Sequence, residues 1–171
     1  GLQRALIAVA ESAQRAAERA EAFIREHVWR EVRLAVSWRQ GKLGIPGFLD
    51  DHAFMLAALL ELQQARWSPG REDWAFALAD TLLEHFEDTE QGGFYFTADD
   101  HEPLIQRPRS FADDALPNGN GIPAEALNRL GVWQADPRYT DAAARTIQAA
   151  SARIHESPGA HCALLSALDE Q

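Results

Sequence analysis

The sequence predicts an all-α protein of about three αα-hairpins, with one small β-hairpin inserted between helices. Helix-forming residues dominate long stretches, and apolar residues recur in them at helical spacing. Strongly amphipathic segments also alternate with nearly apolar ones, which indicates an internal repeat in a two-layer curved array. The paired segments are residues 12–28 with 50–65, 71–87 with 121–130, and 138–155 with 158–169.

Composition limits the functions that the chain can have. Its 171 residues are 46% hydrophobic, enough for a single globular domain over residues 1–171. Sixteen Lys and Arg against 26 Asp and Glu give a net charge of −10, which argues against nucleic-acid and membrane partners. Without a signal-peptide pattern or a long apolar run, we expect a soluble cytoplasmic protein. The single cysteine, Cys162, excludes an intrachain disulfide, and its apolar neighbours predict that it is buried.

The predicted helices differ in how much of their surface is apolar. Residues 2–28 favour a helix that could restart at Ser12, with Ala16, Ala20, Phe23 and Ile24 on its inner face. Helix 50–65 has hardly any polar face and should be surrounded by protein, whereas helix 71–87 should lie at the surface. The apolar stripe of helix 71–87 contains Trp74, Ala77, Leu78, Thr81, Leu82 and Phe86.

Helix ends are indicated by glycine and proline. Gly131 is expected to stop helix 121–130 as its C′ residue. The pairs Asp136-Pro137 and Ser157-Pro158 each place an N-cap residue before a proline, so helices should begin at both. The first of them carries an apolar stripe of Tyr139, Ala143, Ile147, Ala150 and Ile154.

The segment 91–121 does not have a helical pattern. Phe94–Thr97 and Leu104–Gln106 are short extended runs around a turn, which predicts the inserted β-hairpin, and Val32–Trp38 is a further extended piece. The loop that follows is rich in Asp, Asn, Gly and Pro and ends at the helix beginning near Gly121. In a two-layer array the loops before inner helices open on one side, so this loop should meet the Asp50-Asp51 loop.

Several stretches resemble a known family. The sequences GFLDDHAFMLAALLELQQA and GGFYFTADDHEPLIQRPRSFADDALPNGNG, with a final helix after Pro-Gly-Ala, are similar to the C-terminal part of the spermatogenesis-associated protein 20 / YyaL-like family. The resemblance runs from about Phe23 to Leu168, and Asn118 and Asp114 depart from the family's usual Ser and Gly.

The resemblance implies a fold. Proteins of this family join a thioredoxin-like domain, which this chain does not contain, to an α/α toroid similar to the six-hairpin glycosidases and the N-acylglucosamine 2-epimerases. About three hairpins would form a partial toroid. We therefore expect a fragment of a longer chain, or a half-ring that a second copy completes as a homodimer.

Two carboxylates are the predicted catalytic residues, Asp51 and Asp113. Adjacent helical residues point about 100° apart, so only one of Asp50 and Asp51 can face a cavity; Asp51 is assigned there and Asp50 to capping. Asp113 has no capping duty evident from the sequence, and the family's motif has Asp at this place. Glycoside chemistry needs one carboxyl as acid and another as base or nucleophile. The equal alternative is that Asp113 pairs with Arg107 or Arg109 and holds its loop.

Four residues are predicted to contact a substrate: Tyr95, Arg107, His52 and Asn120. His52 could act as a general base or be a hydrogen-bonded structural residue. Phe94 and Phe96 should share one face, where core packing is favoured over stacking on a sugar, with Tyr95 on the other. Asn118 and Asn120 are expected chiefly to cap the helix beginning at Gly121.

Two functional hypotheses follow. The first is a cleft that binds or processes a carbohydrate, with glycosidase-like or epimerase-like chemistry; the alternative is a non-catalytic module for protein interaction or self-association. Whether the chain is an enzyme stays open. No cofactor is expected, and no metal site either, because the histidines lack the spacing of metal ligands.

Overall fold

The protein consists of α-helices with two short β-hairpins near its N-terminal end. The computed structural model describes residues 2–102 and 105–170, and the helical class expected from the sequence is confirmed. The helices are α1 (Leu2–His27), α2 (Leu49–Ala65), α3 (Arg71–His85), α4 (Gly121–Gln134), α5 (Pro137–Glu156) and α6 (Cys162–Asp169), with a 3-10 turn η1 (Pro158–Ala160). The strands are β1 (Trp29–Arg30), β2 (Arg33–Leu34), β3 (Trp38–Arg39) and β4 (Lys42–Leu43).

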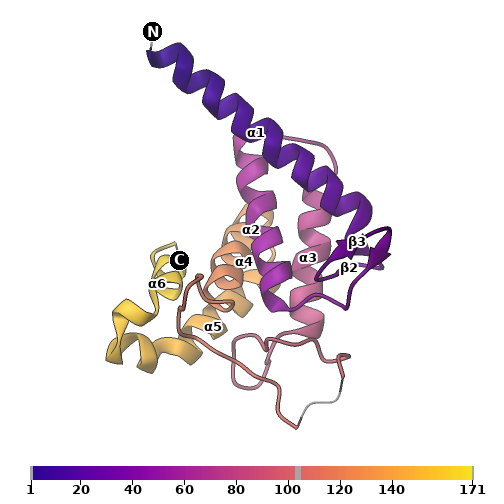
Figure 1. Cartoon of the computed structure of the whole chain (residues 1–171). Helices are drawn as coiled ribbons and strands as arrows, with labels where there is room; N and C mark the ends of the chain where they lie inside the picture. The colour runs from indigo at the N-terminus through magenta and orange to yellow at the C-terminus, as the bar shows by residue number, and fades with distance from the viewer. Residues whose placement is uncertain (1, 103–104, 171) are drawn as a thin grey trace.

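The packing of α2 and α4 forms the centre of the fold. Helix α2 packs against α3 and α4, and α4 packs against α5 and α6, so α2, α4 and α6 follow one another in space (Figure 1). The most extensive pair is α4 with α5, followed equally by α2 with α3 and α4 with α6; the predicted pair of residues 71–87 with 121–130 is not among them. Each buried leucine contributes about 1.5–3 kcal/mol. The fully buried leucines of α2, α3 and α4 are Leu56, Leu59, Leu78, Leu82, Leu127 and Leu130.

The amphipathic patterns of α3 and α5 are confirmed. Every predicted stripe residue of α5 is buried, and α3 buries its stripe except Ala77, which is half-buried. The polar sides of these helices are linked to each other. Asp80 accepts a hydrogen bond of 2.8 Å from the Tyr139 hydroxyl, and Glu87 pairs with Arg145 at 2.5 Å. These side-chain contacts link α3 to α5, while acidic residues such as Glu84 remain in solvent.

Helix α1 is only partly packed against the others. It is continuous through Ser12, because the surrounding residues are good helix formers, and its first half projects away from the remaining helices (Figure 1). The predicted inner face is wrong for most of its length: Ala16, Ala20 and Phe23 are exposed, and only Ile24 is half-buried.

The β-hairpins lie elsewhere than predicted. Strand β1 pairs with β2, and β3 with β4, both antiparallel, within residues 29–43. Glu31 and Val32 form the first turn with φ of 50° and 58°, the conformation of a two-residue hairpin loop. Phe94–Thr97 forms no strand; Phe94 makes one isolated bridge to Glu87, and Leu104 lies outside the described residues. The backbone amides of the aromatic run bond to separate partners, Phe86, Pro108 and the Asn120 side chain, so no continuous strand pairing forms.

Gly131 does not end helix α4. The helix continues to Gln134, and Ala135 ends it in the left-handed conformation. A Cβ at Gly131 would lie 2.7 Å from Cγ2 of Thr140 and 3.0 Å from the carbonyl oxygen of Asp136. The glycine is needed for the close approach of α5 rather than for a cap.

Replacing Gly131 with alanine should therefore destabilise the protein by about 1–3 kcal/mol, the usual cost of overpacking. Gly159 is the matched control, because nothing lies within 4 Å of its Cβ position and its φ is not left-handed. Urea unfolding of Gly131→Ala and Gly159→Ala measures the difference. Equal midpoints for the two variants would contradict this packing role.

The C-terminal helix also begins differently from the prediction. Asp136 caps α5 as expected, accepting from the amide of Arg138 at 3.0 Å. Pro158 instead opens the 3-10 turn, and α6 begins only at Cys162, whose thiol is exposed rather than buried. No helix in the described part of the chain has the length and apolar character required to cross a membrane.

Candidate functional site

A pocket lies where the loop 108–120 meets the N-termini of α2 and α4. The Leu49 amide donates to the Phe96 carbonyl at 3.0 Å, which attaches the start of α2 to the segment after α3. A Cβ on Gly119 would overlap the carboxylate of Asp50, so only glycine lets the loop approach so closely. The pocket, called the loop pocket below, has a volume of about 460 Å³. Its polar lining residues are Asp50, Arg109, Ser110, Asp114, Asn118 and Asn120.

The two aspartates at the start of α2 have exchanged their predicted roles. Asp51 caps the helix, because its Oδ2 accepts from the Phe48 amide at 2.8 Å. Asp50 lines the loop pocket, and its carboxylate has no hydrogen-bond partner among the described residues. Burial and, secondarily, the neighbouring charge of Asp51 raise the pKa of the Asp50 carboxyl above its ordinary value. Asp50 is therefore the carboxyl at this helix start that is free to act on a ligand.

Asp113 is held by two backbone amides. Oδ1 accepts from Asn118 N at 2.8 Å, and Oδ2 accepts from Ala163 N at 3.1 Å in the first turn of α6. The carboxylate therefore closes its own loop and caps α6. Neither Arg107 nor Arg109 is its partner, so the predicted pairing is wrong although a structural role is present. Asp113 is not among the residues that line the loop pocket.

His52 is a buried structural residue. Its Nδ1 lies 2.8 Å from the Phe48 carbonyl and its Nε2 accepts from the Leu34 amide at 3.2 Å, which fixes the neutral tautomer with the proton on Nδ1. Burial lowers the pKa of the imidazole. Both ring nitrogens are thus occupied, and the histidine ties the β-hairpin segment to α2 instead of acting as a free base.

Tyr95 and Arg107 belong to a polar cluster. The Tyr95 hydroxyl donates to Asp88 at 2.7 Å, which raises the pKa of the tyrosine, and its ring lies 4.2 Å from the guanidinium of Arg107. Arg107 donates to the carbonyls of His85 and Thr97. Burial alone would raise the pKa of Asp88, but hydrogen bonds from Gln91 and Tyr95 and the charge of Arg109 hold it below its ordinary value. Neither Tyr95 nor Arg107 lines the loop pocket.

The two asparagines hold the loop together. Asn120 is 1% exposed; its amide accepts from Phe94 N and donates to the carbonyls of Phe94 and Ser110. Asn118 accepts from Asn120 N at 2.6 Å and donates to the Ala112 carbonyl. Asn120 makes no side-chain cap to α4, so the predicted capping by this residue is wrong. The Asn120 side chain pairs with the backbone N–H and carbonyl of Phe94, as a neighbouring strand would do in a sheet.

The aromatic residues of the segment are divided between core and pocket. Phe94 is fully buried, as expected. Phe96 is 37% exposed and stacks on Phe48 with ring centroids 4.7 Å apart, so its predicted core position is wrong. Both Phe94 and Phe96 line the loop pocket, which gives it an apolar wall opposite its acidic groups.

Comparison with known proteins identifies relatives of this chain. No family model matches it. Human spermatogenesis-associated protein 20 is 31% identical over 126 residues, which cover 73% of this chain and 16% of the relative. The mouse and rat proteins of the same name are each 30% identical over 126 residues with the same coverage. The chain belongs to the spermatogenesis-associated protein 20 family. It spans about one sixth of the length of these relatives.

The similarity to spermatogenesis-associated protein 20 does not by itself indicate which residues bind a ligand. The loop pocket is lined by Asp50, Asp114 and Phe96, none of which the sequence pattern predicted as a catalytic residue. The sequence contains one indication that Asp50 is the free carboxyl. Asp51 is the third residue after Phe48, the N3 position of the helix. A carboxylate at N3 reaches back to the N-cap amide, which leaves Asp50 without this capping role.

Proposed function

We propose that this member of the spermatogenesis-associated protein 20 family binds a carbohydrate or similar polyol in the loop pocket. The observation that carries the proposal is Asp50, a pocket-lining carboxyl with no partner among the described residues and a raised pKa. Perturbed and unpartnered titratable groups in a concave site are typical of functional residues. The exposed ring of Phe96 supplies the apolar surface on which a sugar ring stacks.

The chemistry expected at this pocket is that of paired carboxyls. Asp50, whose pKa is raised by burial, would act as the acid toward a glycosidic or ring oxygen, while Asp114 of the same pocket would act as base or nucleophile. Asp113 and Asp51 accept hydrogen bonds from backbone amides, which favours structural roles for both. The series α2, α4 and α6 supports the partial α/α toroid that the resemblance implies, in which such clefts occur at the helix N-termini.

Replacing Asp50 with asparagine should raise the Kd for the bound sugar by about tenfold or more, because a hydrogen bond to a charged carboxylate contributes about 1.5–3 kcal/mol. The measurement is isothermal titration of the wild-type chain and of Asp50→Asn against a panel of mono- and disaccharides. Asp73→Asn is the matched control, since Asp73 is an exposed aspartate in the first turn of α3 and is not a lining residue of the loop pocket.

The same variant has a stability signature. A carboxyl whose pKa is raised on folding stabilises the fold below its unfolded pKa and loses that contribution as the pH rises through the folded pKa. At pH 7, Asp50→Asn should therefore unfold at an equal or higher denaturant concentration than wild type. Heat from no sugar in the panel, or an unchanged Kd in Asp50→Asn, would refute the proposal.

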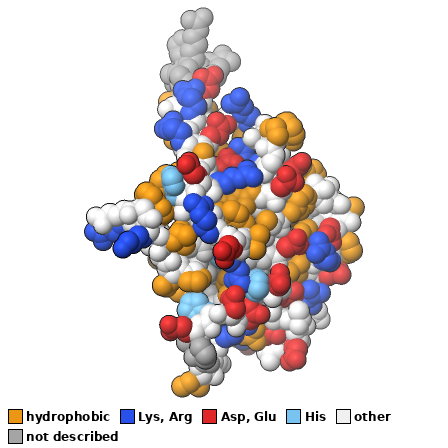
Figure 2. Space-filling model, turned by 90° about the vertical axis from the view of Figure 1, so that its right-hand side faces the viewer, with side chains coloured by type: hydrophobic (Ala, Val, Ile, Leu, Met, Phe, Trp, Pro, Cys, Tyr) orange, Lys and Arg blue, Asp and Glu red, His pale blue; other side chains and the backbone are white. Residues whose placement is uncertain are grey.

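A second candidate function is self-association through an apolar groove between α1, the β-hairpins and α2. Its volume is about 580 Å³, and Phe23 and Trp38 in its lining are 46% and 36% exposed. On the face shown in Figure 2, hydrophobic side chains lie exposed between acidic and basic ones. A monomer by sedimentation equilibrium at all protein concentrations would exclude this candidate.

A further inference from the structure

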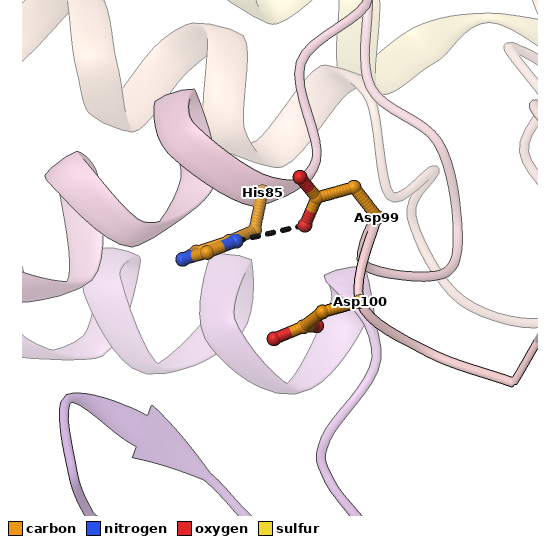
Figure 3. A group of neighbouring side chains, drawn as sticks. All are labelled: His85, Asp99 and Asp100. Carbon is orange, nitrogen blue, oxygen red and sulfur yellow. Dashed lines mark hydrogen bonds and ion pairs between the residues drawn. The ribbon is translucent and has the colours of Figure 1, made fainter.

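We propose that His85, Asp99 and Asp100 form a binding site for a divalent first-row transition metal ion such as Zn²⁺. His85 is the last residue of α3, and the aspartates follow the segment that returns to it (Figure 3). One ligand atom from each residue lies within 4.8 Å of the other two. The site is separate from the loop pocket, which none of the three residues lines.

The closest pair is joined by a hydrogen bond. His85 Nδ1 lies 2.8 Å from Asp99 Oδ1 (Figure 3). Two ligands of a tetrahedral Zn²⁺, each about 2.1 Å from the ion, are about 3.4 Å apart, so these two atoms must separate by about 0.6 Å for the ion to replace the proton between them. Asp100, whose side chain is 63% exposed, closes the set by rotation of its carboxylate.

The backbone holds the two sides of the cluster together. Asp99 N donates to the His85 carbonyl at 2.9 Å, and Arg107 donates to the same carbonyl at 2.9 Å. The meeting of His85 with Asp99 is thus part of the fold rather than a contact between free side chains.

Nearby groups determine which ion fits. Arg33 pairs with Asp100 at 2.9 Å and balances part of the negative charge in the ion-free protein, so the ion must displace this guanidinium from the carboxylate. One imidazole nitrogen with carboxylate oxygens suits Zn²⁺, Co²⁺ or Mn²⁺ better than Ca²⁺ or Mg²⁺, which prefer oxygen alone.

A second imidazole lies at the edge of the same cavity. His101 lines a cavity of about 480 Å³ together with His85, Arg33 and Asp100. It is not one of the three residues whose ligand atoms lie within 4.8 Å of one another, so it is not counted as a ligand. The sequence did not reveal the cluster because His85 and Asp99 are fourteen positions apart in a stretch without a repeating pattern.

The test is isothermal titration of ZnCl₂ into the full chain in chelator-free buffer, for the wild type and for His85→Ala and Asp99→Asn. Removing an outer-shell partner of a metal site costs about 10–100-fold in affinity, so the loss of a direct ligand should raise the Kd at least tenfold. His155→Ala is the matched control, because His155 is exposed near the end of α5.

Circular dichroism establishes that each variant is folded, and visible absorption of the Co²⁺-loaded wild type gives a second readout that Asp100→Asn should change. The proposal is supported if His85→Ala and Asp99→Asn lose affinity while His155→Ala keeps it. No Zn²⁺ binding by the wild type, or an equal loss in His155→Ala, would overturn it.

Discussion

Replacing Asn120 with alanine should destabilise the fold by about 3 kcal/mol or more, because each buried backbone group left without a partner costs about 1–3 kcal/mol. The substitution removes the partners of Phe94 N, at 2.5 Å, and of the Phe94 and Ser110 carbonyls, at 3.0 and 2.8 Å. These bonds join the segment after α3 to the loop before α4. Guanidinium unfolding measures the loss.

The control for this variant is Gln148→Ala. Gln148 is an exposed polar residue on α5, and substitutions at such sites change stability by less than about 0.5 kcal/mol. If Asn120→Ala unfolds at the same denaturant concentration as Gln148→Ala, the loop is not held by Asn120.

Replacing Arg71 with methionine should cost about 3–5 kcal/mol, because it leaves a buried carboxylate without its counterion. Arg71 holds Glu21 through two hydrogen bonds of 2.9 and 2.7 Å, and the two side chains are only 4% and 12% exposed. The same guanidinium donates to the carbonyls of Leu62 and Arg66 at the end of α2. The variant therefore loses both the hydrogen bonds to the C-terminal carbonyls of α2 and the ion pair that holds α1.

Arg66→Met is the control for this variant, because it also removes the charge of an arginine that faces α1, but from an exposed pair instead of a buried one. Arg66 also faces an acid of α1, Glu18, but at 3.7 Å and with 68% of its side chain exposed. An exposed pair of this kind contributes about 0–1 kcal/mol. Thermal unfolding should show a large drop for Arg71→Met and a small one for Arg66→Met; similar drops would contradict the role assigned to the buried pair.

The sequence predicted well what depends on local periodicity. The stripes of α3 and α5 are buried because apolar residues at helical spacing can be removed from water only on one side. Gly131 shows where local rules fail. A glycine near a helix end fits a C′ residue, yet it serves the contact with Thr140 on the next helix.

The sequence indicated which segment holds the polar residues of the candidate site, but it did not predict the role of each residue. Asp113 was selected because its loop shows no capping duty, but its partner is the amide of Ala163, fifty residues further along the chain. His52 likewise depends on Leu34, eighteen residues earlier. Such partners are brought together only by tertiary packing. A segment rich in polar residues can therefore be a loop whose side chains hydrogen-bond its own backbone as readily as a loop that acts on a ligand.

Asp50 carries the functional proposal, and its titration tests that proposal most directly. The measurement is the pH dependence of the Asp50 side-chain carboxyl resonance by NMR, assigned with Asp50→Asn. The structure predicts a pKa above the ordinary aspartate value of 3.8, because the carboxyl is partly buried beside Asp51 and lacks a donor among the described residues. A pKa at or below that value would show that Asp50 is solvated or paired, and would contradict its assignment as the free carboxyl of the loop pocket.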